Sequence, residues 1–130
     1  MISSKLKGKK MQTNLLGNTL EICSKDPMTG FFRDGTCRIN EEDFGSHSVC
    51  AVVTQEFLEY TKTQGNDLST PRPEFGFVGL KPNDKWCLCA MRWKEAYEAG
   101  YAPKIDPNAT SILATKHISK EILLSHSIKS

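Results

Sequence analysis

Residues 49–65, VCAVVTQEFLEYTKTQG, contain in one stretch the two patterns that decide the fold of this chain. The apolar run 49–53 is rich in β-branched valine, which predicts a buried strand. Thr54 follows as a residue of the type that caps helices, and Gly65 is the expected end of the helix. The stretch therefore predicts a strand followed by a helix of about ten residues.

A second stretch, WCLCAMRWKEAYEAG at 86–100, repeats this order. Residues 86–90 predict another buried strand, and residues 91–99 predict a helix that Gly100 ends. Outside these two units the patterns are shorter. They predict a strand at 20–22, a strand at 112–118 and a short helix after Ser119.

The loop between the two units, residues 64–85, is dense in Gly, Pro, Asn and Asp. We expect its four apolar side chains to attach it to the body of the protein: Phe75, Phe77, Val78 and Leu80. Long ordered loops are often functional, so this one is either a wall of a binding site or a plain connection. The predicted fold class is α+β, a small mixed sheet with about three flanking helices and long loops.

Composition indicates a globular chain and argues against two classes of partner. The 130 residues are 38% hydrophobic and 25% charged, with a net charge of +2. Four lysines lie in residues 1–10, which we expect to be a flexible basic tail, and residues 11–130 are the expected single domain. Because the rest of the chain is slightly acidic and has no apolar run long enough to span a bilayer, we expect neither nucleic acid nor membrane binding.

Five cysteines in a chain without a recognisable export signal are the most informative part of the composition. An odd count in that context favours reduced thiols and a cytoplasmic location over a disulfide framework. The simplest interpretation is structural, because free cysteine behaves as a small buried hydrophobe.

A second interpretation is a site for zinc or another transition metal, since thiolate and imidazole are ligands that zinc prefers. In a strand, Cys87 and Cys89 would face the same way, whereas His47 and Cys50 would diverge. The spacing lacks the paired C-x-x-C motifs of zinc knuckles. The candidate ligands are Cys23, Cys37, His47, Cys50, Cys87 and Cys89.

A third interpretation is nucleophilic chemistry, in which a base or a positive charge activates a thiol. The catalytic candidates are Cys50, His47 and Asp67. Arg33 could add positive charge, and Asp34, Asp43 or Asp67 could orient the imidazole. The candidates for ligand binding are Arg33, Asp34, Asn66 and Asp67, although acidic residues at turns commonly bond their own backbone.

Two stretches give the chain a family resemblance: CSKDPMTGFFRDGTC at 23–37, and GSHSVCAVV at 45–53 with its continuation through WCLCAMRW at 86–93. They resemble the uncharacterised bacterial family known as domain of unknown function 2237, over roughly residues 14–127. The resemblance implies a compact cytosolic bacterial domain and no established activity. Asn83 stands where such sequences more often have glycine.

These observations lead to one hypothesis about the site and three about the function. We expect the loops that carry Cys23, Cys50 and Cys87 to gather on one side of the sheet around a polar, thiol-lined cleft. The favoured function is binding of a metal ion or a small ligand in this Cys/His/Asp-lined cleft. The alternatives are a small thiol-dependent enzyme, and a protein-partner module that uses Trp86, Trp93 and the phenylalanines of the loop. Whether the protein is an enzyme stays open.

Overall fold

The computed structural model describes residues 12–128 of the chain, so the predicted tail at 1–10 lies outside the described residues. Its centre is a three-stranded antiparallel sheet in the order β2–β1–β3. The strands are β1 (Val49–Val52), β2 (Lys85–Leu88) and β3 (Lys104–Ile105). Cys50 of β1 lies opposite Cys87 of β2 in the register of this sheet.

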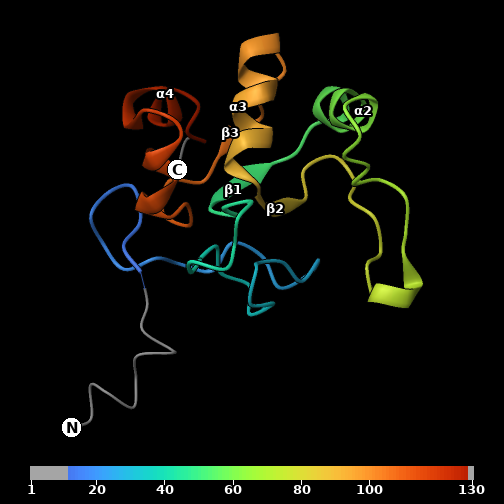
Figure 1. Cartoon of the computed structure of the whole chain (residues 1–130), viewed down its shortest axis with the longest axis horizontal. Coiled ribbons are helices and arrows are strands. Elements are labelled where there is room, and N and C mark those ends of the chain that lie inside the picture. Colours follow the sequence, from blue (N-terminus) through green and yellow to red (C-terminus); the bar gives the residue numbers. More distant parts are fainter. Residues whose placement is uncertain (1–11, 129–130) are drawn as a thin grey trace, which may run out of the picture.

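Three helices lie along one side of the sheet, and the N-terminal segment 12–48 lies on the other side (Figure 1). The helices are α2 (Gln55–Thr63), α3 (Ala90–Ala99) and α4 (Lys120–Ser125). Thr54 caps α2 by accepting a hydrogen bond from an amide of the first turn, and Ser119 caps α4 in the same way. Gly100 ends α3 in the left-handed conformation, with φ +86°.

Strand β1 is buried on both faces, and its two faces have different partners. Val49, Ala51 and Val53 belong to the main apolar core, which includes Phe57 of α2 and Trp93 of α3. Cys50 points the other way, into a separate buried cluster of cysteines. Because side chains alternate along a strand, a strand covered on both sides reads as a continuous apolar run. This explains why residues 49–53 show no polar alternation.

The N-terminal segment 12–48 contains only isolated bridges and turns within its described part. Buried polar groups hold it in place instead. The side chain of Asn14 donates to the carbonyl of Asn108 at 3.0 Å, and its oxygen accepts from the amides of Leu16 and Asn18. Such bonds satisfy buried backbone groups that a sheet or helix would otherwise satisfy.

The predicted α+β class and both strand–helix units are confirmed. The sheet is antiparallel rather than mixed, and the parallel pairing found among the described residues is one bridge between Ile105 and Ser127. The prediction of a strand at 112–118 is wrong, since Ile112–Lys116 is a 3-10 helix. Ser111 starts it by accepting from the amide of Leu113, a capping contact that overrides the β propensity of the isoleucines.

Only two of the four apolar side chains expected to attach the loop between α2 and β2 to the body do so. Leu80 is buried, and the ring of Phe77 lies edge-on to that of Trp86 with centroids 5.4 Å apart. Phe75 and Val78 are 76% and 65% exposed, so the expectation that they attach the loop is wrong. In the described part of the chain, no helix is long and apolar enough to cross a membrane.

Candidate functional site

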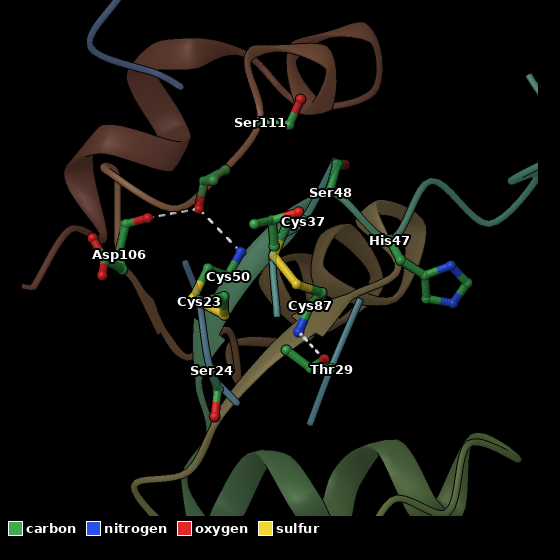
Figure 2. The surroundings of a disulfide bond; sticks show 12 residues. Cys23, Ser24, Thr29, Cys37, His47, Ser48, Cys50, Cys87, Asp106 and Ser111 are labelled. Atoms are coloured by element: carbon green, nitrogen blue, oxygen red, sulfur yellow. Dashed lines mark hydrogen bonds between the residues drawn. A yellow bond between two sulfur atoms is a disulfide. The ribbon is translucent and has the colours of Figure 1, made fainter. Parts of the chain in front are cut away.

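Two disulfides connect the N-terminal segment to the sheet, one to each of two adjacent strands. Cys23 is bonded to Cys50 of β1, and Cys37 is bonded to Cys87 of β2. Figure 2 shows the four residues close together against strands β1 and β2. The Sγ atoms of Cys23, Cys37 and Cys87 all lie within 4.8 Å of one another. The two bridges are therefore in contact and form one buried group of sulfur atoms.

The expectation of reduced thiols is wrong for these four cysteines. Segment 12–48 has little regular structure of its own, so covalent links supply the attachment that a helix or strand would obtain by packing. The expected gathering of Cys23, Cys50 and Cys87 is confirmed, because the two bridges bring them together. The linear sequence carried no signal for which cysteines would pair.

The backbones of the two strand cysteines are fixed by threonine hydroxyls rather than by each other. The amide of Cys50 donates to Thr110 Oγ1 at 3.0 Å, and the amide of Cys87 donates to Thr29 Oγ1 at 2.9 Å (Figure 2). Cys50 and Cys87 are thus a non-hydrogen-bonded pair of the antiparallel ladder, the type in which opposite side chains lie closest.

Cys89 is the one unpaired cysteine of the described chain, and it does not join the other four. The expectation that it would face the same way as Cys87 assumed a strand through residue 90. Strand β2 ends at Leu88, and Cys89 is the N-cap of α3. The change from strand to helix removes the period-two alternation on which that expectation depended.

His47 forms a tight pair with Asp43 on the loop that leads into β1. Its ring Nδ1 lies 2.7 Å from Asp43 Oδ1, and its backbone amide donates to Asp43 Oδ2 at 2.9 Å. The side chain of Asp43 is 1% exposed, whereas that of His47 is 42% exposed. Because an ionised carboxylate only accepts hydrogen bonds, Nδ1 carries the proton of this contact, and Nε2 is the ring nitrogen that Asp43 does not engage.

The loop around His47 depends on the two residues before it. Ser46 has φ +51°, and its carbonyl accepts from the amide of Ala90 at the start of α3. A Cβ atom on Gly45 would lie 2.9 Å from His47 Cε1, so the imidazole lies directly over the glycine. The ring position thus requires glycine at residue 45.

His47 faces a cleft of about 270 Å³ that borders one of the disulfides. Three parts of the chain form it: the N-terminal segment, including the loop that leads into β1, the long loop before β2, and β2 itself. Its lining residues are Thr29, Gly30, Phe31, Arg33, His47, Leu68, Trp86 and Cys87. Leu68 belongs to the 64–85 loop, so this loop contributes one lining residue to the cleft.

Arg33 is the permanent positive charge of this cleft. Its guanidinium carbon lies 5.7 Å from the centroid of the Trp86 ring, within the range of a cation–π contact. Its backbone has φ +56°, a conformation that is uncommon for residues other than glycine. Residues held in such conformations cluster at binding and active sites, because the surrounding structure must enforce them.

Three other predicted ligand-binding residues have local partners and do not line this cleft. Asp34 accepts from Thr36 and Arg38, and the side chain of Asn66 donates to Thr61 at the end of α2. Asp67 closes a turn. The hydroxyl of Thr70, with the amides of residues 69 and 70, holds the pKa of the Asp67 carboxyl below its ordinary value.

The predicted catalytic set is separated in the structure. Cys50 is fully buried and disulfide-bonded, and Asp43 rather than Asp67 holds the imidazole of His47. His47 lies to one side of the sulfur cluster and points away from Cys50 (Figure 2). The six predicted metal ligands likewise divide into four bonded cysteines, the unpaired Cys89 and the histidine.

Four lining residues were not among the predicted site residues: Thr29, Gly30, Phe31 and Leu68. The first three lie in the segment between Cys23 and Cys37, so knowledge of the disulfide pairing would have placed them near β2. Trp86 was predicted only as part of a partner surface. Trp93, predicted for that same surface, is fully buried and donates its indole N–H to the carbonyl of Pro103.

The structure thus defines a small α+β protein whose irregular N-terminal segment is cross-linked to a three-stranded sheet beside a cleft. Residues 13–127 match a family described as an uncharacterized protein conserved in bacteria (DUF2237). The chain belongs to this family, as its sequence predicted. No curated protein matches it.

Proposed function

We propose that this protein binds a small anionic ligand in the cleft between Arg33, His47 and Trp86. The observation that carries the proposal is the Asp43–His47 pair, which fixes an imidazole at the edge of a cleft that also contains a guanidinium and an indole. A buried carboxylate that fixes one ring nitrogen leaves the other oriented for a ligand.

Charge and size indicate the class of ligand. The lining residues include Arg33 and His47, and none of the described lining residues is acidic. Guanidinium groups bind carboxylate and phosphate oxygens with paired hydrogen bonds. At about 270 Å³ the cleft lies just below the usual range for small-molecule sites, so the ligand is smaller than a typical drug.

Nuclear magnetic resonance tests this proposal with inorganic phosphate, acetate and succinate as probes. We expect at least one of them to shift the indole N–H signal of Trp86 and the ring signals of His47, with saturation at millimolar concentration. Arg33→Gln should abolish the shifts. Arg72→Gln, which removes an exposed charge from the loop, is the matched control and should retain them. Equal shifts in both variants, or no saturable shift with any probe, would exclude the proposal.

A metal site made by the cysteines after reduction is a second candidate. Four cysteine sulfurs in one buried group match the donor set of a structural zinc site. Sulfur atoms around zinc lie about 3.8 Å apart, given Zn–S bonds of about 2.3 Å in a tetrahedron. Three of the four already lie within 4.8 Å of one another. Sulfurs joined in disulfides are not thiolates, so metal binding requires reduction of both bridges first.

Cobalt is the probe for this candidate, because tetrahedral thiolate ligation gives it intense absorption. The chain is reduced without oxygen and titrated with Co²⁺. We expect one ion per chain and its displacement by Zn²⁺, with Cys37→Ser losing the absorption. Cys89→Ser is the matched control and should keep it. A reduced chain that shows no such absorption rules this candidate out.

The cytoplasmic location stays a prediction, since disulfides are typical of oxidising compartments.

A further inference from the structure

We propose that Cys87 is a thiol-exchange site, at which a small thiol bound in the cleft forms a mixed disulfide and passes the exchange to Cys23. Of the four bridged cysteines, Cys87 alone lines the cleft within the described structure. Its bridge to Cys37 is in contact with the second bridge, since the Sγ atoms of Cys23, Cys37 and Cys87 lie within 4.8 Å of one another. The entry of the thiol through the cleft rests on the proposed function, whereas the sulfur-to-sulfur transfer does not.

The first step breaks one bond and forms one. The thiolate of the small molecule attacks Cys87 Sγ, and a new S–S bond joins the two. The Cys37–Cys87 bond breaks, and its electron pair leaves on Cys37 as a thiolate. The oxidation state of the protein sulfurs together with the small thiol is unchanged, as in every thiol–disulfide exchange.

The second step uses the proximity of the two bridges. Cys37 and Cys23 have their Sγ atoms within 4.8 Å of each other, so the released Cys37 thiolate is beside the Cys23–Cys50 bridge. Attack on Cys23 forms a Cys23–Cys37 bond and releases Cys50 as a thiolate. Neither sulfur has to cross a layer of other side chains.

The third step closes the cycle across the sheet. Cys50 lies opposite Cys87 in the register of β1 and β2, as a non-hydrogen-bonded pair. Such pairs have Cα atoms about 4.5 Å apart, within the range that a disulfide spans. The Cys50 thiolate attacks Cys87 Sγ, forms a Cys50–Cys87 bond and expels the small thiolate. The thiol is regenerated, so no external oxidant or reductant is needed.

The exchange changes what the disulfides connect. In the structure both bridges join the N-terminal segment to the sheet. After the exchange, one bridge lies within that segment and the other within the sheet, so no disulfide joins the two. Thr29, Gly30, Phe31 and Arg33 lie between Cys23 and Cys37 and form one wall of the cleft. The exchange therefore releases the wall that carries Arg33.

Disulfide mapping tests the proposal on the oxidised wild-type chain. The protein is treated with limiting mercaptoacetate, quenched with acid, alkylated and digested with trypsin. Lys25, Arg38 and Lys85 are among the cleavage sites that place the four cysteines on separate peptides. We expect mercaptoacetate on Cys87 first, followed by a Cys23–Cys37 peptide pair. Cys23 is 6% exposed and Cys87 is 1% exposed, so attack governed by exposure alone would favour Cys23. Mercaptoacetate found on Cys23 first would therefore overturn the proposal.

A single variant tests the internal transfer without any added thiol. Cys50→Ser leaves Cys23 as a free thiol beside the Cys37–Cys87 bridge. We expect its map to contain Cys23–Cys37 or Cys23–Cys87 in addition to the original bridge. A map with the Cys37–Cys87 bridge alone would overturn the proposal. If this variant does not fold, the order in which mercaptoacetate adducts and new disulfides form in the wild-type chain tests the proposal instead. Cys89→Ser is the matched control and should give the wild-type map.

Comparison of two thiols separates this proposal from the proposed function. Mercaptoacetate is anionic and cysteamine is cationic, and each rate is normalised to the same thiol's rate with free cystine. We expect the anionic thiol to react about tenfold faster, because a positive cleft raises the local concentration of an anion. Arg33→Gln should remove this preference. If the wild type reacted with both thiols at equal normalised rates while exchange still occurred at Cys87, anion binding would be refuted and the exchange site would be supported.

Discussion

His47 is held by Asp43 through two hydrogen bonds, one to its ring and one to its backbone. Nδ1 lies 2.7 Å from Oδ1, and the amide donates to Oδ2 at 2.9 Å. Both oxygens of a nearly fully buried carboxylate are thus used to fix a half-exposed imidazole. The pair fixes the orientation of an imidazole that lines the cleft before any ligand arrives.

Asp43→Asn should disturb both the tautomer of His47 and the stability of the loop. The amide side chain presents one acceptor instead of two, so one of the two hydrogen bonds is lost or replaced by a repulsive contact. Loss of a buried acceptor costs about 1–3 kcal/mol of unfolding free energy. Urea denaturation measures the stability, and nitrogen chemical shifts of the ring report the tautomer. Glu41→Gln, an exposed change nearby, is the control, and equal effects of both variants would contradict the assigned role.

Gly45→Ala should displace the imidazole while leaving the fold in place. The added Cβ atom would lie 2.9 Å from His47 Cε1, closer than carbon atoms approach in proteins. We expect the ring signals of His47 to shift and binding of the anionic probe to weaken, with an unfolding free energy within about 1 kcal/mol of the wild type. Phe44→Ala changes a 94% exposed neighbour and should leave binding unaltered. If Gly45→Ala bound the anionic probe as tightly as the wild type, the imidazole would not contact the ligand.

Sequence patterns predicted the strand–helix units because hydrophobic periodicity and caps are local. Thr54, Gly100 and Ser119 each act within one helical turn, and all three do so in the structure. Residues 112–118 were predicted wrongly because a single side chain, Ser111, started a 3-10 helix there. Local β propensity predicts secondary structure poorly where one side-chain hydrogen bond to the backbone stabilises a different conformation.

The site was predicted only in part because its residues meet through long-range contacts. Arg33, His47 and Cys87 were singled out by their chemistry and do line one cleft. The cysteine pairing depends on how segment 12–48 folds back on the sheet, and the spacing of cysteines does not encode this. The residues around Thr29 entered the cleft through that same covalent attachment.

Reduction of both bridges should destabilise the chain strongly. The bridges span 27 and 50 residues, and loop-closure entropy assigns them about 3.5 and about 4 kcal/mol when each is considered alone. The two loops overlap, so the combined loss is smaller than the sum. Urea denaturation of oxidised and reduced protein, without metal, measures the difference, with Cys89→Ser as the control for thiol chemistry in general. Equal stability of the two forms would show that segment 12–48 is held by packing alone.

Acid titration should reveal a stabilising contribution from Asp34. Partial burial raises the pKa of its carboxyl, but hydrogen bonds from Arg38 and Thr36 and the charge of Arg38 outweigh this, so the pKa lies below the ordinary value of 3.8. A carboxyl with a lowered pKa in the folded state stabilises the protein above its unfolded pKa, and this contribution disappears as the pH falls through the folded value. Asp34→Asn should therefore be less stable than the wild type at pH 7, and the difference should shrink below pH 3.8. Urea midpoints measured across this range check it, with Asp26→Asn as the exposed control. A difference that does not change between neutral and acid pH would assign the role of Asp34 to its shape rather than its charge.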